Sequence, residues 1–412
     1  MALHTLLVHQ AFASKDDPGG TRHYELGKRL VSQGQRFTVV ASDVNYVTGK
    51  RSAEKARLFA ESTEDGICVI RAYTYPAWHK SYIARVFSFL SFMVTGVIGG
   101  LKADTPDVVM GTTPPIFQSL SAWFLAFVRR RPFLLEVRDL WPEFAIDIGL
   151  LKNPVLIAGA RGLESFLYRR ADHLLVNSPA YRDYMISKGI SADKISVIAN
   201  GVDPGMFDPV ARGGDLRRQW NLEDKFVVTY AGAIGMANDL DVLIRAAELI
   251  KNREDVHILI VGDGKERSRL GRLASSLGLT NVLFTGALPK SQMPTVLAAS
   301  DACVAILRNI KMFTTTYPNK VFDYMAAGRP TILAIDGVIR TVIEQAEGGV
   351  FVPPGDAAQL AAAILEMASD PTGAREKGRK ARSFVVQHFN RDDHARELSD
   401  LICRVAHARH NG

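Results

Sequence analysis

The sequence predicts an α/β protein made of two Rossmann-like, doubly wound parallel-sheet domains that face each other across a cleft. The chain has 412 residues, about twice the length of an ordinary domain. Short apolar segments alternate with amphipathic ones, as in parallel sheets whose strands are joined by helices. The alternation runs once and then begins again. We therefore expect one domain over residues 1–203 and a second over residues 204–390.

Composition narrows the class of protein. The chain is 47% apolar and 23% charged, which suits full hydrophobic cores and argues against long disorder. Its 50 basic and 43 acidic residues give a net charge of +7. This excess is too small to indicate a nucleic-acid-binding protein, but it suits a phosphate-bearing partner or an anionic membrane surface. The three cysteines are far apart and form no Cys-x-x-Cys pair, which favours a reducing cytoplasm without disulfide or zinc sites.

The first series of elements starts at the N-terminus. Thr5–Val8 and Phe37–Ala41 are apolar enough for buried strands, and Thr21–Gln33 between them has helical spacing. No basic region precedes a long apolar run, so we interpret the N-terminus as a first strand and not as a signal peptide. Further strands are expected at Asp107–Met110, Phe133–Val137, His173–Val176 and Ile195–Ile198.

The second series follows the turn-forming segment Asn200-Gly201-Val202-Asp203-Pro204-Gly205, which marks the domain boundary. The helical C-terminal stretch, residues 391–412, is expected to pack back on the first domain. The expected strands are Phe226–Tyr230, Val256–Val261, Val282–Phe284, Ala302–Ile306 and Thr331–Leu333, and the expected helices are Asp239–Ile250, Lys265–Ser276 and Met293–Ala299.

Two apolar stretches of the first domain bear on a membrane. Val86–Leu101 carries no charge but is shorter than the roughly 20 residues of a spanning helix. It is a buried helix, a half-immersed interfacial helix or, least favoured, a span. Ile116–Val128 is apolar and runs into Arg129-Arg130-Arg131, which is either an anchor for anionic lipid or a solvated end of a core helix. Together these stretches predict peripheral membrane contact through the first domain.

Glycine loops follow several of the expected strands. Glycines let a backbone approach a ligand closely, and the start of the next helix offers unpaired N–H groups to an anion. The full dinucleotide fingerprint and the Walker pattern are both absent, which argues against classical NAD binding and a P-loop. The loop residues that we assign to a nucleotide-shaped site are Gly19, Gly20 and Arg22 in the first domain and Gly232, Gly235, Gly262, Gly264, Arg267 and Leu288 in the second.

The segment Thr316–Pro330 is the most informative. Pro318 suits the first turn of a helix, which places Asn319 and Lys320 near its positive end. A lysine is poorly placed there unless an anion such as a diphosphate offsets it. Asp323 lies one turn further on, where its carboxylate could accept hydrogen bonds from sugar or ribose hydroxyls.

Here the chain resembles a known family. The segment Thr316–Pro330 is similar to the donor-binding signature of GT-B glycosyltransferases, in particular the retaining family four. The turn at Asn200–Asp203, the loop at Val261–Gly264 and the segment Val352–Asp356 match the same family. The segment Glu136–Glu143 is similar to the fucosamine-transferase-like enzymes that build bacterial surface polysaccharides such as O-antigen or capsule.

The resemblance implies residue roles, and the sequence departs from the family in places. Asp323 occupies the second position of the family's paired glutamates, and Thr315 stands where the first would be. The usual Arg and Lys after the first glycine loop of the second domain are missing, which leaves Lys320, Arg22 and Arg267 as candidates to bind the diphosphate. Arg138, Asp139 and Glu143 are the candidate catalytic residues, with a structural Arg138–Asp139 ion pair as the alternative.

We therefore expect a retaining transferase that moves a sugar, with an N-acetylated amino sugar as the favoured class, from a UDP-sugar to a polyprenyl-diphosphate-linked saccharide. It would act at the inner face of the cell membrane. No cofactor or metal is expected, because no Asp-x-Asp motif occurs and cations with helix ends can neutralise the leaving diphosphate. A nucleotide-sugar epimerase of the same shape and a non-catalytic sugar-binding protein remain as alternatives.

Overall fold

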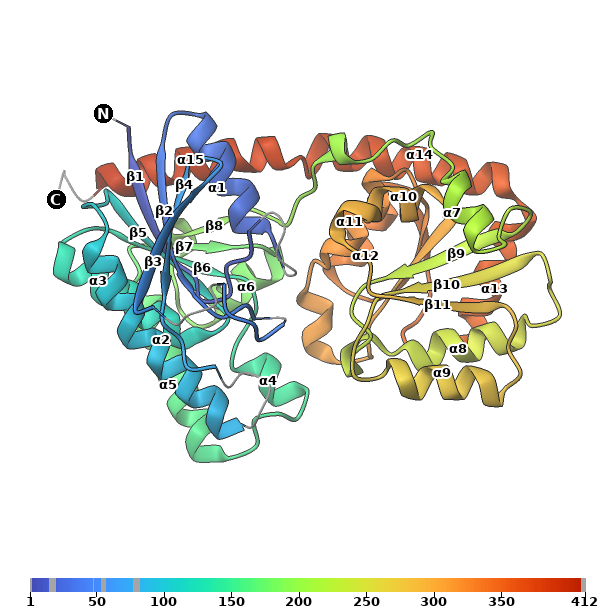
Figure 1. Ribbon diagram of the computed structural model, residues 1–412, viewed down its shortest axis with the longest axis horizontal. Coiled ribbons are helices and arrows are strands. Elements are labelled where there is room, and N and C mark those ends of the chain that lie inside the picture. Colours follow the sequence, from blue (N-terminus) through green and yellow to red (C-terminus); the bar gives the residue numbers. More distant parts are fainter. Residues whose placement is uncertain (1, 15–19, 47, 53–56, 77–81, 409–412) are drawn as a thin grey trace. The chain divides into compact units, whose positions relative to one another are not determined.

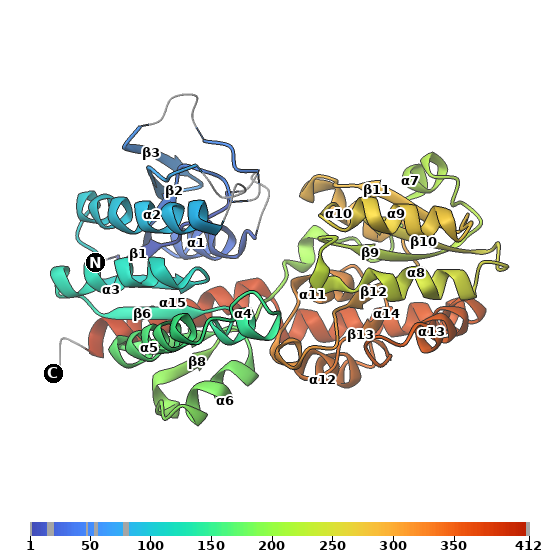
Figure 2. The same cartoon turned by 90° about the horizontal axis from the view of Figure 1, so that it is seen from below.

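The computed structural model describes residues 2–14, 20–46, 48–52, 57–76 and 82–408 (Figures 1 and 2). Its contacts divide the chain into two compact units, Met1–Ala199 with Asp392–Gly412, and Asn200–Arg391. The observed boundary precedes the expected one at residue 203. Asn200 donates from Nδ2 to the carbonyl of Tyr317 over 2.9 Å, and the backbone of Val202 bonds to Phe389, so these residues belong to the second unit.

The first unit is built on one eight-stranded sheet with the order β3-β4-β2-β1-β5-β6-β7-β8. All neighbouring strands are parallel except the antiparallel pair β3 and β4. That pair was not expected from the sequence. The strands are β1 (His4–Val8), β2 (Arg36–Ser42), β3 (Phe59–Glu64), β4 (Ile67–Ala72), β5 (Val108–Thr113), β6 (Phe133–Val137), β7 (His173–Val176) and β8 (Ile195–Val197).

Helices cover both faces of this sheet. On one face, Leu26 and Leu30 of α1 (Arg22–Ser32) and Leu398 and Ile402 of α15 (Arg391–Ala408) join one core with the strands. The other face carries α2 (Tyr82–Lys102), α3 (Ile116–Arg129) and α5 (Pro154–Arg170), as Figures 1 and 2 show. The shorter elements are α4 (Glu143–Asp147), α6 (Pro179–Ser187) and the 3-10 helix Ala192–Lys194.

The second unit has a six-stranded, fully parallel sheet with the order β11-β10-β9-β12-β13-β14. This arrangement confirms the expectation of two doubly wound parallel-sheet domains. The order reverses at β9, and open sheets of this kind bind ligands beyond the carboxyl ends of the strands at such a point. The strands are β9 (Phe226–Ala231), β10 (Val256–Val261), β11 (Val282–Gly286), β12 (Ala302–Ile306), β13 (Thr331–Ala334) and β14 (Gly349–Phe351).

One face of the second sheet packs against α8, α9 and α13, and the opposite face against α10, α11, α12 and α14 (Figure 1). The helices are α7 (Gly214–Gln219), α8 (Leu240–Leu249), α9 (Arg267–Ser276), α10 (Met293–Ala298), α11 (Asn319–Ala326), α12 (Val338–Gln345), α13 (Ala357–Ser369) and α14 (Pro371–His388). Single 3-10 turns occur at Pro204–Met206, Met236–Asn238, Lys290–Gln292 and Lys311–Thr315.

A buried carboxylate links the elements around the centre of the first sheet. Glu136 lies in β6 with a fully buried side chain and accepts from Arg22 Nε over 3.0 Å. Its second oxygen lies 2.5 Å from His23 Nε2 and accepts from Thr112 over 3.0 Å. Arg138 donates in turn from Nε to Thr112 Oγ1 over 2.9 Å. The cations hold the pKa of Glu136 well below its usual value despite the opposing effect of burial, so the carboxylate is charged in the folded unit.

This cluster corrects the role expected for Arg22. Its guanidinium bonds to Glu136 and donates over 2.9 Å to the carbonyls of Ala199 and of Ile198. All of these partners belong to the first unit. Arg22 therefore acts as a strut between α1, β6 and the end of β8, and it is not aimed at a diphosphate.

Replacement of the buried carboxylate tests this structural role. We expect Glu136→Gln to lower the free energy of unfolding of the first unit by about 3 kcal/mol, because Arg22 keeps a buried charge without its partner. Two units need not unfold as one, so the measurement is the amide hydrogen exchange of β6 rather than a single melting temperature. Glu61→Gln, on the exposed strand β3, is the control. Equal protection of β6 in the two variants would show that the cluster is not structural.

Candidate functional site

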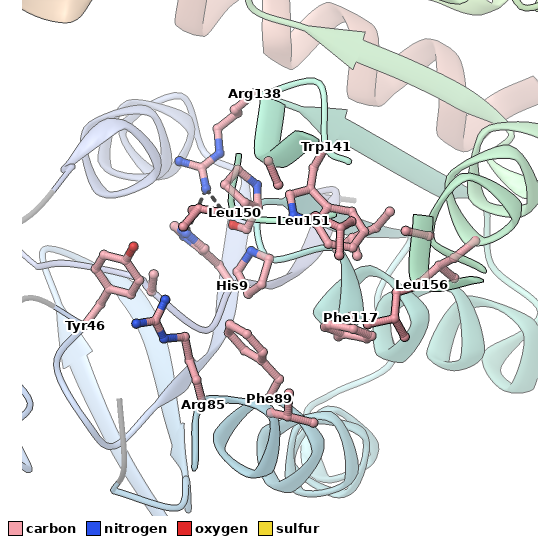
Figure 3. Close-up of a pocket in the computed structure, with 18 of the residues that line it drawn as sticks. His9, Tyr46, Arg85, Phe89, Phe117, Arg138, Trp141, Leu150, Leu151 and Leu156 are labelled. Carbon is pink, nitrogen blue, oxygen red and sulfur yellow. Dashed lines mark hydrogen bonds between the residues drawn. The ribbon is translucent and has the colours of Figure 1, made fainter. Parts of the chain in front are cut away.

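The first unit contains a pocket of about 630 Å³ at the carboxyl ends of its central strands (Figure 3). Loops after β1, β5 and β6 form it, which is the position where the strand order of the sheet reverses. Its size lies within the ordinary range of ligand sites. The polar side chains that line it are His9, Asn45, Tyr46, Arg85 and Arg138, and the larger apolar ones include Phe12, Phe89, Phe117, Trp141, Leu150, Leu151 and Leu156.

Arg138 and Asp139 directly follow β6. Arg138 lines the pocket, lies 3.2 Å from His9 Nε2 through Nη2, and is 3.8 Å from the carboxylate of Glu136. Among the described residues, Asp139 forms no ion pair, so the expected alternative of a structural Arg138–Asp139 pair is wrong. Burial raises the pKa of Asp139 to about 6, although the charge of Arg138 opposes the shift. A carboxylate with this pKa is poised to accept a hydrogen bond or proton near neutral pH.

Glu143 is better explained as a structural residue than as a catalytic one. It begins α4 and accepts two hydrogen bonds from Arg161 of α5, over 2.8 and 2.9 Å. These bonds lower the pKa of Glu143. Because its carboxylate is held by a bidentate arginine, Glu143 ties α4 to α5 and thereby fixes the wall of the pocket.

The glycine loops of the second unit fit together backbone to backbone. Gly262 has φ +145°, and a Cβ there would lie 1.9 Å from the carbonyl oxygen of Gly232. A Cβ at Gly264 would lie 2.3 Å from the carbonyl oxygen of Ile234. Only glycine therefore allows the loops after β9 and β10 to approach each other. This contact brings three of the expected donor-binding positions together.

Lys320 reaches the same place from α11. A Cβ at Gly232 would lie 2.8 Å from Lys320 Nζ. The ammonium donates to Tyr230 Oη over 2.9 Å and to Asn238 Oδ1 over 3.3 Å, and it lies 4.1 Å from the centroid of the Tyr230 ring. These neutral partners hold the lysine without an anion, which the sequence argument did not foresee. Burial lowers the pKa of Lys320 to about 7.

Further side chains of α11, and Lys290 from a neighbouring turn, lie in the same region. Asp323 is half-buried, and burial raises its pKa to about 6 against the charge of Lys290. Asn319, at the start of the helix, is exposed. Tyr324 Oη accepts from the Ala231 amide over 2.9 Å, which fixes α11 to the end of β9. Lys290 was not predicted from the sequence, although a basic residue directly after the third glycine loop could have indicated it.

The remaining expected residues lie at the edge of this region. Arg267 lies 3.6 Å from Asp263 and next to Gly286, and Leu288 is half-buried in the loop after β11. Gly235 lines a hollow of about 170 Å³ together with Arg308. Arg308 was also missed, and its signal was a basic residue two positions after the buried strand β12.

Gly19 and Gly20 of the first unit were also expected to bind the donor. Gly19 lies outside the described residues. Gly20 lines the first-unit pocket, so it lies in a different unit from Gly232, Gly262 and Lys320. Its role toward a donor stays a prediction.

Helix α2 is apolar on two faces. One face packs on the sheet and on α3: Phe92 is fully buried, and a Cβ at Gly100 would lie 2.4 Å from Leu125. The opposite face exposes a stripe of apolar side chains at helical spacing, each 42–58% exposed: Phe87, Leu90, Val94, Ile98 and Leu101. By length and composition alone, Ala84–Lys102 is the one helix of the described residues that could cross a membrane, with a third of it buried.

The arginines at the C-terminal end of α3 divide into two kinds. Arg129 donates to the carbonyls of Leu101 and Ala103, over 2.6 and 3.1 Å, and so caps the C-terminal end of α2. Arg130 is exposed and adopts the left-handed conformation that ends α3. The expectation that all three arginines form one lipid-facing cluster is therefore wrong for Arg129.

Comparisons with known proteins agree with this geometry. Residues 19–201 match a family model described as "Glycosyl transferase 4-like domain", and residues 225–370 match "Glycosyl transferases group 1". A protein of Escherichia coli assigned to colanic acid biosynthesis as a glycosyl transferase, WcaI, is 23% identical over 89% of this chain and 94% of its own. A GDP-mannose-dependent alpha-mannosyltransferase of Mycobacterium tuberculosis is 27% identical over 72% of each chain.

Among solved structures, Anabaena HepE in complex with UDP and glucose superposes with a TM-score of 0.71 at 20% identity, over 97% of this chain and 99% of its own. At that identity the likeness supports the fold alone. The two family models together cover most of the chain, including the strands and glycine loops of both units. The chain belongs to the group 1 glycosyltransferases and has two Rossmann-like domains of the GT-B type.

Proposed function

We propose that the protein is a retaining transferase that moves a sugar, an N-acetylated amino sugar in our interpretation, from a UDP-sugar to a polyprenyl-diphosphate-linked saccharide. It would serve bacterial surface polysaccharide synthesis at the inner face of the cell membrane. The alternative within this fold is a nucleotide-sugar epimerase, which would need no acceptor.

The observation that carries the donor half of the proposal is the position of Lys320 against the glycine loops. Gly232 and Gly262 let the loops after β9 and β10 meet backbone to backbone, and the ammonium of Lys320 lies beside Gly232. A cation whose pKa burial has lowered to about 7 gains much from an anion, since a diphosphate supplies the charge that its present partners lack. Asp323 would then accept hydrogen bonds from sugar or ribose hydroxyls.

The transfer itself needs one bond to form and one to break. The acceptor hydroxyl oxygen would bond to the anomeric carbon while the bond from that carbon to the diphosphate oxygen breaks. In the same-face attack that the family resemblance implies, the leaving diphosphate takes the hydroxyl proton. Lys320 would stabilise the charge that develops there, and Asp139 would orient the acceptor hydroxyl. No metal is required in this scheme.

The identity of the nucleotide base is inferred from relatives, and the relatives differ in the nucleotide associated with them. HepE is solved with UDP, whereas the mycobacterial relative is named for GDP-mannose. We favour UDP because of the resemblance to enzymes that use UDP-linked amino sugars. A thermal-shift panel of UDP- and GDP-sugars decides between them, since a bound donor stabilises the fold.

The membrane half of the proposal rests on the apolar stripe of α2, defined by Phe87, Leu90, Val94, Ile98 and Leu101. A lipid-linked acceptor keeps its sugar near the bilayer, so an enzyme that uses it benefits from an apolar surface that enters the headgroup region. Exposed Arg130 would add attraction to anionic lipid. The stripe would rest on the bilayer, while the buried face of α2 stays packed on the sheet.

The first prediction concerns the donor. Lys320→Met should weaken UDP binding by about 10- to 100-fold, because a charge-assisted hydrogen bond is lost, while uridine binding changes little. Above pH 7 the unliganded lysine is mostly neutral, so UDP binding at pH 8 should take up a proton in the parent protein and less in the variant. Calorimetry in two buffers measures both effects.

Lys251→Met is the control, because Lys251 lies between α8 and the amino end of β10, away from the glycine loops. Unchanged UDP affinity and proton uptake in Lys320→Met would remove Lys320 from the donor site.

The second prediction concerns turnover. Asp139→Asn should reduce transfer of labelled sugar to a lipid acceptor by about 100-fold, with UDP affinity retained. The parent should lose activity as the pH falls through about 6, because Asp139 becomes protonated, and the variant should lack this limb. The rates are measured at saturating donor, so that titration of Asp323, which acts on donor binding, does not contribute to the pH profile. An unchanged rate would make Asp139 peripheral, and formation of an epimerised nucleotide sugar without acceptor would support the alternative function.

The third prediction concerns the membrane. Replacement of Phe87, Val94 and Ile98 by Ser should reduce flotation of the protein with anionic vesicles by about tenfold. The buried face of α2 is untouched, so the fold should persist. The control carries Ser at Val210, Met236 and Leu249, which are exposed apolar residues of the second unit. Equal losses in the two variants would mean that the stripe has no specific role.

A further inference from the structure

The pocket of the first unit is divided into a polar end and an apolar end. Figure 3 shows Tyr46 and Arg85 toward one end and Phe117 and Leu156 toward the other. Arg138 lines the pocket as well. Its hydrogen bonds come from Nε and Nη2, so among the described residues its Nη1 has no hydrogen-bond partner. Two guanidiniums therefore face a cavity whose opposite wall is apolar.

The apolar end is built from aromatic rings and leucines of α2, α3 and α5 and of the loops after β6 and α4. Phe89 of α2 stacks on Phe117 of α3 with centroids 5.8 Å apart, and Phe117 meets Trp141 edge-on at 6.2 Å. Leu150 is 71% exposed and Leu156 is 53% exposed, although both line the cavity. An open apolar wall of this kind is unfavourable in water and marks a surface that another molecule covers.

We infer that this pocket encloses the isoprene units next to the diphosphate of a polyprenyl-diphosphate-linked acceptor, with Arg85 and Arg138 binding the diphosphate. The charge is complementary, because guanidiniums bind phosphate oxygens in a fixed fork geometry. The cavity is also lined by the helix that carries the apolar stripe, because Arg85, Val86 and Phe89 belong to α2.

The assignment rests on the proposed function but goes beyond it. The proposed function requires only that the acceptor lipid stay in the bilayer. The pocket adds that the protein itself recognises the first part of the chain, so the enzyme would select isoprenoid diphosphates over other anionic lipids.

Two glycines of α5 provide a matched test. Gly159 lines the pocket and Gly162 is absent from its lining, and a Cβ at either position would meet nothing within 4 Å. Gly159→Phe should therefore fill the apolar end without disturbing the fold, and Gly162→Phe should place the same ring outside it. Leu156→Gln, at an exposed position, is a second variant that makes the wall polar without adding bulk.

The measurement is calorimetric binding of farnesyl diphosphate with saturating UDP present, so that the donor site is already filled. The parent protein should bind farnesyl diphosphate about tenfold or more tightly than inorganic diphosphate and than dihexanoyl phosphatidic acid. Gly159→Phe and Leu156→Gln should lose this preference, and Gly162→Phe should keep it. Arg85→Ser should weaken binding of both diphosphates.

Three outcomes would overturn the inference: equal affinity of the Gly159→Phe and Gly162→Phe variants for farnesyl diphosphate, no preference over inorganic diphosphate, or equally tight binding of phosphatidic acid. Because the assay involves no transfer, it separates the two claims. Lost glycosyl transfer with intact farnesyl diphosphate selectivity would count against the proposed function alone. Transfer to lipid without that selectivity would count against the pocket alone.

Discussion

The buried carboxylate of Glu136 is the interaction on which the first unit depends. A charge at the centre of a parallel sheet is costly unless it is paired and hydrogen-bonded, and Arg22, His23 and Thr112 surround the carboxylate. The same cluster reaches Arg138 through Thr112 and a 3.8 Å ion pair. A charge that must be satisfied for the unit to fold therefore also holds the one arginine that follows β6 and lines the pocket. Stability and site geometry are coupled here through one residue.

The candidate site of the second unit differs from the cluster around Glu136, because it is made mainly of backbone. Gly262 and Gly264 bring the loops after β9 and β10 closer than any side chain would allow, and Tyr324 fixes α11 to the end of β9 through the amide of Ala231. With those constraints, the side chain of Lys320 is held against Gly232 and does not move freely in solvent. Its neutral partners hold the ammonium in place, and none of them neutralises it. Under the proposed function, the diphosphate of the donor would supply the negative charge that these neutral partners lack.

Much of the fold could be predicted because parallel strands that are buried on both faces are continuous apolar runs. Phe133–Val137 and Val256–Val261 are such runs, and both are strands with the predicted bounds. The hairpin of β3 and β4 was missed because β3 is polar and exposed at the sheet edge, although Asp65-Gly66, with φ values of 47° and 81°, has the sequence of a tight hairpin turn. The site was harder to predict. Arg22 was expected to bind a ligand because it lies next to a glycine loop, but its partner is Glu136, 114 positions away in the sequence. Glu143 likewise pairs with Arg161, which the sequence does not reveal.

Under the proposed function, the second unit would bind the donor and the first unit the acceptor, and the two sites differ as these ligands do. A nucleotide diphosphate is charged and compact, so close backbone approach and one cation with a lowered pKa suit it. A lipid-linked acceptor is long and apolar with a charged junction, so it suits a pocket that has guanidiniums at one end and aromatic rings at the other. The exposed stripe of α2 follows from the same logic. A helix that only closed a core would bury one face and carry polar residues on the other, whereas α2 is apolar on both, and Arg85 and Phe89 at its first turns line the pocket. Under the proposed function, this outer face would form part of the route by which an apolar chain reaches the pocket.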